Sequence, residues 1–406
     1  MSGLPQRLSL TSLDTIPALF DAHHPPLVER LGEVAQTLLS EASHDSAKVA
    51  ADMGARLKLY RYLVPEAHGG AAVGKSEPTE IDVRSLVLIR DALGYASPLA
   101  DAIFAVQGLG SYPIVLAGSD AQRERYLPGV IRGERIAGFG LTEPEAGSDV
   151  ASMQCEARPD GDGWVLEGDK HFISNVPIAH HHVVFAKVAG DEATLKRLGA
   201  PEDPRRRITA FVVESDAAGL EQETQKLSIH HPIGALRFRG CRIPGEARLG
   251  AIGQGFKLAM QTLDTFRISV GAAANGMATA ALDDAIAFVK GREQFGRPLS
   301  AQQMIQGYLA DMATELDAAR LLVARAAHQK DTTEGRASTE VAMAKMFATE
   351  AAQRIVDKAV QLHGGRGVLS ETRVENLYRD VRPLRIYEGT TEIQRIIIAR
   401  ALLKDT

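Results

Sequence analysis

The chain has 406 residues, of which 45% are hydrophobic and 24% charged, a composition typical of a globular protein with length for two or three domains. Its formal net charge of -5 gives no general attraction to nucleic acid or membrane surfaces, so an anionic ligand would need a local group of Arg and Lys. The two cysteines, Cys155 and Cys241, form no Cys-x-x-Cys pair, which argues against a disulfide framework or a thiolate metal site and favours a reducing compartment.

Neither a secretory signal nor a membrane span is expected. Residues 1–10 lack the continuous apolar segment of a signal, and Asn275, Asp283 and Asp284 interrupt the alanine-rich stretch 271–289. We therefore predict a cytoplasmic protein that binds no membrane.

The first third of the chain has helical periodicity. Apolar residues recur at intervals of three and four over 27–41, 80–95, 100–117 and 120–132, with Pro, Gly or Ser between these segments. Residues 1–134 are therefore predicted to form an N-terminal α-helical domain.

A different pattern begins near residue 136, where short apolar runs are separated by Gly, Pro and Asp. The runs at 164–166, 183–186 and 211–213 have strand character, and residues 236–239 alternate apolar and charged side chains as a half-solvated strand does. Residues 135–248 are therefore predicted to form a central β domain, barrel-like or sandwich-like, with an exposed loop at 190–208.

Three consecutive histidines, His180, His181 and His182, lie just before one of these predicted strands. Because alternate residues of a strand face opposite sides, at most two of them could share a ligand set. We interpret them as solvated side chains at a strand edge and predict no metal site.

Helical spacing returns in residues 249–406 and forms two long apolar stripes. The stripes consist of Val270, Ala274, Met277, Ala281, Ala285 and Phe288, and of Val341, Ala344, Ala348, Ala352, Ile355, Ala359 and Leu362. Small residues on long helices favour close packing, so this part is predicted to be a C-terminal α-helical bundle domain. The chain as a whole is predicted to have an α+β multidomain fold in the order α, β, α.

The segment 386–395, Ile-Tyr-Glu-Gly-Thr-Thr-Glu-Ile-Gln-Arg, places one carboxylate, Glu388, in a loop just before a predicted helix. Thr391 and Gln394 have capping-box spacing, so the helix is expected to begin near Thr390. Free amides at a helix start favour negative charge and would help to keep Glu388 ionised. A loop glutamate in this position is either a catalytic base or an ordinary solvated residue.

Four further motifs accompany this loop. They are Pro-Glu-Ala-His-Gly-Gly at 65–70, Leu-Thr-Glu-Pro-Glu-Ala-Gly-Ser-Asp at 141–149, Arg-Glu-Gln-Phe-Gly at 292–296 and Gln-Leu-His-Gly-Gly-Arg-Gly at 361–367. As a set, from about residue 27 to residue 403, they resemble the acyl-CoA dehydrogenase family of FAD-dependent flavoproteins. The resemblance implies the same three-part arrangement, with a four-helix bundle at the C-terminal end.

The activity implied by the resemblance is α,β-desaturation of an acyl-CoA thioester to the 2-enoyl-CoA. This chemistry needs a base, stabilisation of the enolate oxygen and a hydride acceptor, which no side chain can provide. No nicotinamide fingerprint follows a predicted strand, so the resemblance supplies FAD. It also implies that Glu388 is the base and that its backbone amide, with a ribityl hydroxyl of FAD, holds the thioester oxygen. Some relatives carry the base on the helix of Arg267, but the corresponding residue here, Phe266 or a close neighbour, is not acidic.

The resemblance also implies which residues contact the two ligands. The implied FAD-binding residues are Phe139, Leu141, Thr142, Gly147, Ser148, Phe172, Ile173, Ser174, Arg292, Phe295, Gln302, Gln303, Gln361, Gly364, Gly365, Thr390 and Glu392. The implied substrate-binding residues are Ser148, Asp264, Arg267 and Gly389. Plainer alternatives remain open: a simple turn at 139–148, an exposed arginine at 292, a helix C-cap at 364–365, and a local ion pair between Asp264 and Arg267.

The chain departs from the family at one of these positions. Phe172 stands where the family commonly has Trp, so a ring donor and some stacking area are lost. Ser174 keeps the hydroxyl expected beside the flavin nitrogen that accepts the hydride. We expect flavin binding to survive this change, while contact with the electron-transfer partner is left open.

The implied partners are an acyl-CoA substrate, an electron-transferring flavoprotein or similar acceptor, and further copies of the chain in a homotetramer built as a dimer of dimers. Three alternatives stay open: an acyl-CoA oxidase, a dehydrogenase of carrier-protein thioesters, and a non-catalytic flavin-containing binding protein. The last kind binds DNA through a basic C-terminal extension, whereas this chain ends at Lys404-Asp405-Thr406, and no nucleic-acid partner is expected. Acyl-chain length and branching are not predicted, but a glutaryl group should be disfavoured because Asp101 lies near the position of the arginine that binds its carboxylate in glutaryl-specific relatives.

Overall fold

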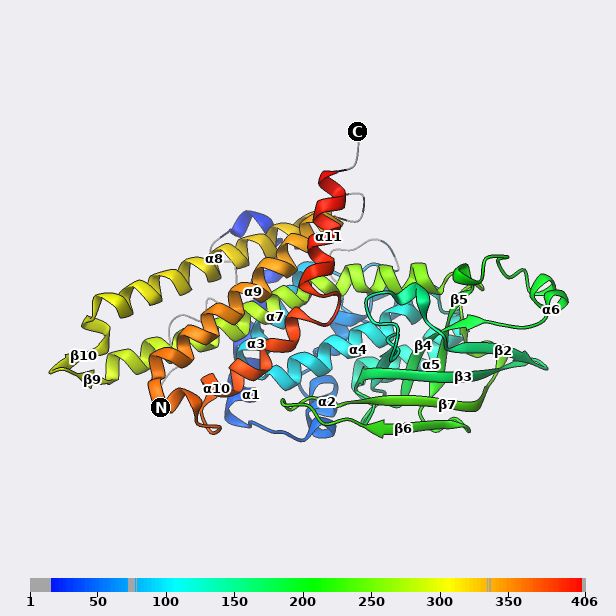
Figure 1. Cartoon of the computed structure of the whole chain (residues 1–406), viewed down its shortest axis with the longest axis horizontal. Helices are drawn as coiled ribbons and strands as arrows, with labels where there is room; N and C mark the ends of the chain where they lie inside the picture. Colours follow the sequence, from blue (N-terminus) through cyan, green and yellow to red (C-terminus); the bar gives the residue numbers. More distant parts are fainter. Residues whose placement is uncertain (1–15, 72–76, 78, 334, 336, 404–406) are drawn as a thin grey trace. The chain divides into compact units, whose positions relative to one another are not determined.

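The computed structural model describes residues 16–403 except 72–76, 78, 334 and 336. The chain divides into two compact units (Figure 1). One consists of residues 1–43, 82–101 and 264–406, and the other of residues 44–81 and 102–263. Two long helices, α4 (Pro98–Ala117) and α7 (Gly255–Gly291), contribute residues to both units. Each unit is therefore assembled from segments that are far apart in the sequence.

The described residues of the first unit form helices and one short hairpin. The helices are η1 (Pro17–Leu19), α1 (His24–Ser40), α3 (Val83–Ala96), most of α7, η7 (Leu299–Ala301), α8 (Gln303–Thr332), α9 (Ser338–His363), η8 (Gly364–Val368), α10 (Arg373–Asp380), η9 (Arg382–Arg385) and α11 (Thr391–Leu402). The hairpin pairs β9 (Glu293–Gln294) with β10 (Arg297–Pro298). It connects α7 to α8 at the end of these helices that lies away from α11 (Figure 1).

Small residues allow the helices of the first unit to approach one another closely. One buried cluster combines Val83 of α3, Ile268 of α7, Val323 of α8 and several alanines of α9. A Cβ atom added at Gly276 of α7 would lie 2.0 Å from the carbonyl oxygen of Asp91 on α3. The backbones of α3 and α7 are therefore in direct contact, and side chains near this crossing are fixed between them.

The helices of the second unit are α2 (Ser46–Ala55), α5 (Asp120–Arg132), α6 (Glu192–Arg197), most of α4 and the first residues of α7. Its short 3-10 turns are η2 (Tyr60–Leu63), η3 (Glu66–His68), η4 (Val150–Ser152), η5 (Pro204–Arg206) and η6 (Gly245–Ala247). Side chains fix two of the helix starts. Asp45 accepts hydrogen bonds from two amides of α2, and Ser119 and Gln122 form a capping box at α5.

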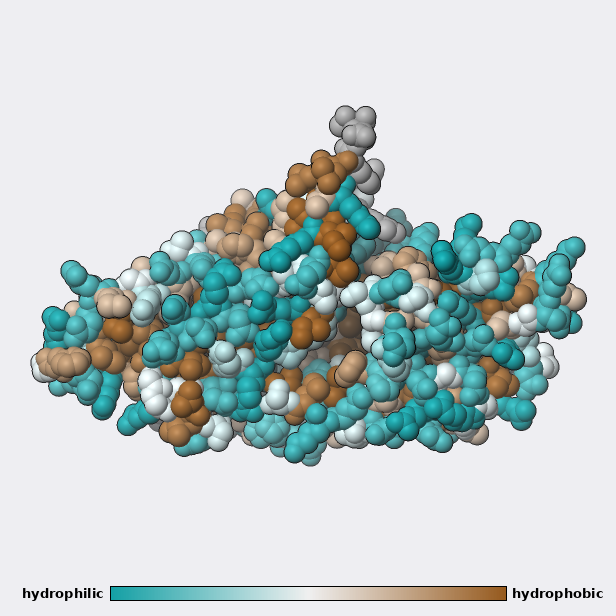
Figure 2. All heavy atoms as spheres, viewed as in Figure 1, coloured by the Kyte–Doolittle hydropathy of each residue, from teal (hydrophilic) through white to brown (hydrophobic). Residues whose placement is uncertain are grey.

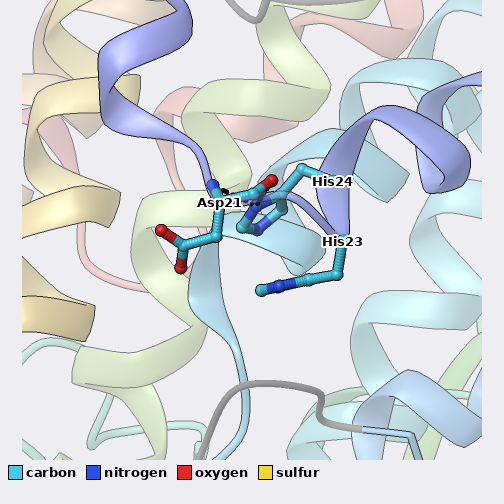
Figure 3. Close-up of side chains that lie close together, drawn as sticks. All are labelled: Asp21, His23 and His24. Atoms are coloured by element: carbon cyan, nitrogen blue, oxygen red, sulfur yellow. Dashed lines mark hydrogen bonds between the residues drawn. The ribbon is translucent and has the colours of Figure 1, made fainter.

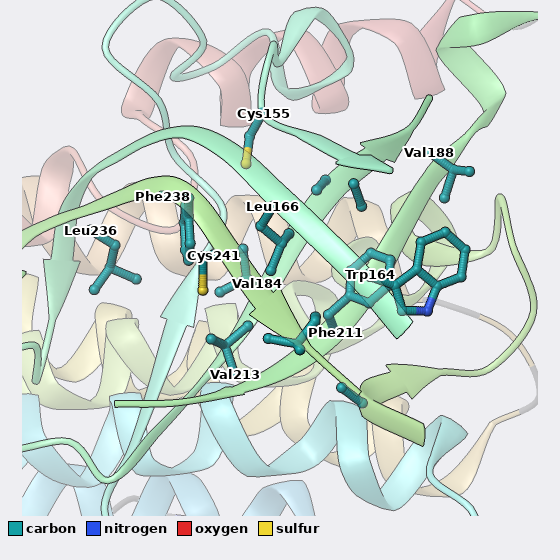
Figure 4. Packing of buried hydrophobic residues seen from close by; sticks show 14 of the residues in the cluster. Cys155, Trp164, Leu166, Val184, Val188, Phe211, Val213, Leu236, Phe238 and Cys241 are labelled. Atoms are coloured by element: carbon teal, nitrogen blue, oxygen red, sulfur yellow. The ribbon is translucent and has the colours of Figure 1, made fainter. Parts of the chain in front are cut away.

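The second unit also contains one mainly antiparallel eight-stranded sheet. The strands are β1 (Ala137–Gly140), β2 (Glu156–Asp160), β3 (Gly163–Ser174), β4 (His181–Val188), β5 (Ile208–Glu214), β6 (Leu220–Thr224), β7 (Ile233–Ile243) and β8 (Arg248–Leu249). They run in the order β6-β7-β3-β2-β4-β5-β8, and β1 pairs in parallel with β4. Trp164, Leu166, Phe211 and Phe238 pack in the sheet's buried core (Figure 4).

Among the described residues, one helix, α4, is long and apolar enough to cross a membrane by length and composition. Within its most apolar window, 89% of the residues are buried. The core helix of a globular domain has the same character, so α4 is weak support for a membrane span.

The predicted fold class is confirmed: an N-terminal helical part, a central β-sheet part and a C-terminal helical part follow one another along the chain. The helices predicted in the first third correspond to α1, α3, α4 and α5, but α2 was not predicted. The loop expected at 190–208 instead contains α6 and the turn η5. The domain boundaries after residues 134 and 248 stay a prediction.

Candidate functional site

Glu388 lies in the short loop between η9 and α11, and its backbone is in an unusual conformation. Its φ is +52°, in the left-handed region that favours glycine, and the next residue, Gly389, has a φ of +92°. A Cβ atom at Gly389 would lie 2.6 Å from Nε2 of Gln394. Such strained conformations persist where surrounding contacts impose them, and they concentrate at functional sites.

Three side chains from three helices hold this loop by its carbonyl groups. Arg267 of α7 donates from Nε to the carbonyl oxygen of Glu388 at 2.8 Å. Lys345 of α9 and Gln394 of α11 both donate to the carbonyl oxygen of Gly389, each at 2.9 Å. The loop is therefore fixed by its main chain, which leaves the carboxylate of Glu388 free for other interactions.

The Glu388 carboxylate is buried within the first unit. Its side chain is 5% exposed, and Oε1 lies 4.0 Å from Nη1 of Arg90 on α3. The other oxygen, Oε2, is buried without a hydrogen-bond partner among the described residues. Burial raises the pKa of this carboxyl above its ordinary value, while the charges of Arg90, Arg267 and Lys345 act in the opposite direction. A carboxyl with a raised pKa and an unpaired oxygen is suited to accept a proton.

Two of these cations, Arg90 and Lys345, were not predicted from the sequence. Both side chains are fully buried on helices. Burial lowers the pKa of Lys345 from 10.5 to about 8, although Glu388 partly offsets this effect. The sequence did carry a signal for Lys345, because a charged residue there interrupts the buried face of a helix. Lys345 lies four residues after buried Val341 and four before buried Thr349.

Asp264 and Arg267, both predicted to bind substrate, are paired on α7. Nη1 of Arg267 lies 3.1 Å from Oδ1 of Asp264, and both side chains are largely buried. The simpler interpretation, a local ion pair, describes this contact, and the Nε donor of Arg267 additionally fixes the Glu388 loop. The structure thus brings Asp264, Arg267, Glu388 and Gly389 together.

The start of α11 differs in detail from its prediction. The helix begins near Thr390 as expected, and the Thr390 hydroxyl accepts a hydrogen bond from the amide of Ile393. The predicted capping box of Thr391 and Gln394 is wrong. The Thr391 hydroxyl donates to Glu350 at 2.8 Å, and Gln394 binds the carbonyl of Gly389. Tertiary contacts therefore take up both side chains. The predicted cofactor contact Glu392 is an exposed residue in the first turn of α11.

A second group of predicted residues lies at the far end of the first unit. Arg292 directly follows α7, and Phe295 and Gln302 lie between α7 and α8, with Phe295 96% exposed. At about 1.5 Å per residue, the end of α7 is about 36 Å from Arg267 along the helix. The rings of Phe288 and His363 stack at 4.4 Å, so the ends of α7 and α9 lie together.

The other members of this second group are Gln303, the first residue of α8, and Gln361, Gly364 and Gly365 at the end of α9. All four are exposed. Gly364 has a φ of +58°, and a Cβ atom at either glycine would meet nothing within 4 Å. The end of α9 is thus a helix terminus with accessible backbone, and Gly364 is its C-cap residue, as the plainer alternative has it.

In the second unit, the predicted flavin loop 139–148 is anchored by a buried ion pair. Nζ of Lys170 lies 2.7 Å from Oε1 of Glu143 and donates to the carbonyl oxygen of Leu141 at 3.2 Å. The Glu143 carboxylate also accepts hydrogen bonds from the amides of Gln154 and Cys155. This network fixes the position of the loop, and with it the polar groups of the neighbouring loop residues.

The other predicted residues of this loop vary in exposure. Phe139 is half-buried and packs edge-on against Phe185 with ring centroids 5.1 Å apart. Thr142 is half-buried and accepts a hydrogen bond from the amide of His171 through its carbonyl oxygen. Gly147 and Ser148 are exposed. A Cβ atom at Gly147 would meet nothing within 4 Å, so the chain itself gives no steric reason for glycine there.

Strand β3 ends at the three residues predicted to flank the flavin. The Phe172 side chain is 61% exposed and its φ is +56°, whereas Ile173 is buried. The hydroxyl of Ser174 lies 2.7 Å from Nε2 of His231, a contact that was not predicted. Burial lowers the pKa of His231 to about 4, so the imidazole is neutral at pH 7.

The interpretation of the consecutive histidines as solvated is wrong for two of them. His181 and His182 are both fully buried in β4, and only His180 is exposed. Burial lowers the pKa of His182 to about 4 and lowers that of His181 well below its usual range. The strand is buried on both faces, which a pattern of three polar residues does not reveal.

One group of possible metal ligands occurs among the described residues, at Asp21, His23 and His24 (Figure 3). Nε2 atoms of both histidines lie 3.1 and 3.0 Å from Oδ2 of Asp82, and Arg84 pairs with Asp21. A guanidinium beside the group opposes a bound cation. We interpret the group as a charge network that attaches the start of α1 to α3.

Models of one protein family match the chain in three consecutive segments. The N-terminal, middle and C-terminal domains of acyl-CoA dehydrogenase match residues 27–134, 138–241 and 253–403. Relatives with assigned names include a 3-(aryl)acrylate reductase of Clostridium sporogenes, 39% identical over 84% of this chain and 86% of that protein. The caffeyl-CoA reductase-Etf complex subunit CarC of Acetobacterium woodii is 34% identical over 93% of this chain and 92% of that protein.

Solved structures agree with this assignment. Butyryl-CoA dehydrogenase from Megasphaera elsdenii superimposes with a TM-score of 0.84 and 30% identity, covering 95% of this chain and 99% of that chain. An acyl-CoA dehydrogenase from Bacillus anthracis complexed with FAD gives a TM-score of 0.82 and 29% identity, covering 95% of this chain and 68% of that one. The chain therefore belongs to the acyl-CoA dehydrogenase family and is an oxidoreductase that acts on a CH–CH bond.

Proposed function

We propose that the chain catalyses α,β-dehydrogenation of an acyl-CoA thioester, with Glu388 as the base that removes the α proton. The observation that carries this proposal is the state of the carboxylate. It is 5% exposed, one of its oxygens lacks a partner among the described residues, and a positive-φ backbone presents it. Burial raises its pKa, which makes it a stronger base than a solvated glutamate.

Four residues are proposed to bind the substrate. Asp264, Arg267, Gly389 and Ser148 are the candidates that family resemblance supplies. Support for the first three comes from their position around the base, because Arg267 fixes the carbonyl of Glu388 and pairs with Asp264. A substrate held by groups that also hold the base would keep its α carbon within reach of the carboxylate.

FAD is the proposed cofactor, since the family is flavin-dependent and a solved relative is complexed with FAD. When bound, it supplies the acceptor for the hydride that leaves the β carbon. The residues of this chain fit such a group. Phe172 has an exposed ring on a strained backbone, Ser174 adds a hydroxyl, and accessible backbone at Gly364 and Gly365 suits a phosphate.

The full proposed set of FAD contacts is the one that family resemblance supplies. It comprises Phe139, Leu141, Thr142, Gly147, Ser148, Phe172, Ile173, Ser174, Arg292, Phe295, Gln302, Gln303, Gln361, Gly364, Gly365, Thr390 and Glu392. Arg292 suits a pyrophosphate because its planar fork makes two charge-assisted hydrogen bonds at once.

A homotetramer, built as a dimer of dimers, is the proposed assembly. The α7 terminus before Arg292 lies about 36 Å along the helix from Arg267. We therefore propose that Arg292 and the predicted residues that lie with it at this end of the first unit contact the cofactor of a neighbouring subunit. Exposed apolar residues support an oligomer. Figure 2 shows hydrophobic side chains along α11, where Ile396 and Leu402 are 43 and 74% exposed, and Leu403 directly after the helix is 80% exposed.

An electron-transferring flavoprotein is the proposed electron acceptor. The support is the relative from Acetobacterium woodii, which is named as a subunit of an Etf complex. We also propose a cytoplasmic location, no nucleic-acid partner, and domains at 1–134, 135–248 and 249–406.

An anaerobic visible-absorbance titration with a panel of straight, branched and cyclic acyl-CoA esters tests this function. Bleaching of an oxidised flavin band by one ester, lost in Glu388→Gln, is the expected result. A flavin band that no ester bleaches would contradict the acyl-CoA assignment, and a protein without flavin would contradict the cofactor. Oxygen consumption with and without an artificial acceptor separates a dehydrogenase from an oxidase.

Reduction of a 2-enoyl thioester is a second candidate, because two of the relatives are named as reductases of an arylacrylate and of caffeyl-CoA. The same groups serve this reaction in reverse, with Glu388 returning a proton to the α carbon. Adding cinnamoyl-CoA to the dithionite-reduced protein tests it. Reappearance of the oxidised flavin band would support the reductase direction, and an unchanged reduced spectrum would exclude this substrate.

A further inference from the structure

Arg90 is a fully buried arginine in α3 whose guanidinium is held from two sides. Nε and Nη2 donate to the two carboxylate oxygens of Asp101 on α4, both at 2.8 Å. Nη1 donates to the hydroxyl of Ser269 on α7 at 3.0 Å. A bidentate pair with a third hydrogen bond allows the planar guanidinium little freedom. Three elements of the first unit therefore fix its position.

This fixed guanidinium approaches the carboxylate of Glu388. Nη1 of Arg90 lies 4.0 Å from Oε1 of Glu388, and the two side chains are 0 and 5% exposed. Asp101 pairs with the buried charge of Arg90 on the Nε–Nη2 edge. The Nη1 end, which faces Glu388, keeps its positive character. The pair therefore acts as a small dipole with its positive end towards the base.

The other charged groups around Glu388 also make other contacts. Arg267 from α7 and Lys345 from α9 donate to the carbonyl oxygens of Glu388 and Gly389, so they hold the loop's main chain in addition to lowering the pKa of the Glu388 carboxyl. Asp101 from α4 acts on Glu388 in the opposite sense to the three cations, and the phenol of Tyr387, the residue before Glu388, is the further titratable group beside Arg90. Among the described residues, Arg90 is the cation within 4.0 Å of the carboxylate itself.

We propose that Arg90, clamped by Asp101 and Ser269, is a positioning residue that keeps the Glu388 carboxylate ionised and aimed in its buried site. The inference rests on the proposed role of Glu388 as base. Without a nearby cation, a buried glutamate takes up a proton and can no longer act as a base. An opposite charge within about 4–6 Å lowers a carboxyl pKa by about 1–3 units, enough to decide which form is present near neutral pH.

The test measures protonation of Glu388 directly in the flavin-loaded protein. The infrared carboxylic-acid band of Glu388 is assigned by its loss in Glu388→Gln and followed as a function of pH. In Arg90→Met, the midpoint of this band should move upward by about 1–3 pH units. Arg90→Lys, which keeps a cation, should move it much less. An unchanged midpoint in Arg90→Met would overturn the inference.

Arg90→Met leaves Asp101 buried without its charged partner and could therefore fail to fold. A second variant keeps the proposal testable in that case. Arg90→Met/Asp101→Asn removes both charges, and its midpoint should shift in the same direction by a smaller amount, because Asp101 opposed Arg90. The matched control is Arg84→Met. Arg84 is also buried on α3 and paired with an aspartate, Asp331, but lies six residues earlier, about 9 Å along the helix.

Arg84→Met should leave the midpoint of the Glu388 band unchanged. If the midpoint moved equally in Arg84→Met and Arg90→Met, the shift would be a general effect of losing a buried ion pair, and the proposal would be overturned. The readout needs no turnover, so it stays informative if no ester bleaches the flavin. In that case the proposed function fails while the infrared midpoints still decide the role of Arg90. With an active ester, the acid limb of the pH–rate profile should move with the infrared midpoint.

Discussion

Replacing Lys345 with Met is predicted to stabilise the protein at neutral pH while slowing its chemistry. The Lys345 ammonium is fully buried and donates to the carbonyl oxygen of Gly389 at 2.9 Å. Burial lowers its pKa from 10.5 to about 8, with Glu388 offsetting part of the effect and Arg267 adding to it. The charged form is therefore maintained in the folded state at pH 7 at a cost in stability.

The size of this effect follows from the pKa. The difference between 10.5 and about 8 corresponds to about 3 kcal/mol of the free energy of unfolding at pH 7. Lys345→Met removes this cost together with one charged hydrogen bond, whose net contribution is about 1.5 kcal/mol. The carbonyl of Gly389 keeps the hydrogen bond from Gln394 and is not left unpaired. A net stabilisation of about 2 kcal/mol is expected.

The pH dependence gives this prediction a definite sign. Between pH 8 and 10.5 the folded state binds fewer protons at Lys345 than the unfolded state, so the stability of the unmodified protein rises with pH over this interval. The stability of Lys345→Met does not rise in this way, so the higher free energy of unfolding that it has at pH 7 should largely disappear by about pH 9.5. Thermal and urea unfolding at the two pH values measure the difference.

Lys358→Met, a change at a half-buried position on the same helix, controls for the residue type. Activity provides the second readout, because loss of the Lys345 charge should raise the pKa of Glu388 and move the acid limb of the rate profile upward. If Lys345→Met were less stable than the unmodified protein at pH 7, or equally favoured at both pH values, the reasoning from burial would be refuted.

Three further outcomes are expected. Gly389→Ala should lower the rate of flavin reduction at least about 10-fold, because the φ of Gly389 is +92° and the new Cβ would clash with an α11 side chain. Gly291→Ala is the control: a Cβ there would meet open space, so the rate of flavin reduction should not fall. Asp82→Asn should lower the free energy of unfolding by about 3 kcal/mol in urea titrations, since two histidines lose their partner. Burial alone would raise the pKa of Asp82, but hydrogen bonds lower it. The contribution of Asp82 to the free energy of unfolding is therefore present above about pH 4 and is lost as the pH falls further. If Asp82→Asn showed the same acid sensitivity as the unmodified protein, this reasoning would be contradicted. Lys170→Met should destabilise the second unit by about 3 kcal/mol in thermal unfolding, and Lys170→Met/Glu143→Gln should recover part of the loss.

The helices of the fold were predictable because each buries one face. The stripes through Val270 and Val341 correspond to α7 and α9, whose small residues pack in the first unit. Helix α2 was missed because its ten residues carry a weak apolar pattern, although Asp45 was an available start signal. Only fragments of β3 and β4 were predicted. Both are longer than their apolar runs, and β4 also buries two histidines.

The candidate base was predictable, but its surroundings were not. Sequence spacing reveals that Glu388 precedes a helix, and family resemblance gives it a role. The cations that set its charge state come from α3, α7 and α9, and only Arg267 carries a family signal. Arg90 and Lys345 are distant in sequence and meet Glu388 only through tertiary packing, which local patterns do not encode. The same packing explains why the predicted capping box at Thr391 is wrong.

The most direct test of the central claim is a stopped-flow measurement of flavin reduction under anaerobic conditions. The protein is mixed with the ester that bleaches its flavin, and Glu388→Gln is compared with the unmodified chain. Removal of a general base typically lowers a rate about 10²–10⁴-fold, so Glu388→Gln should reduce its flavin at least about 100 times more slowly while still binding the ester. Reduction of the Glu388→Gln flavin at the unmodified rate would contradict the account, because the α proton would then have another acceptor.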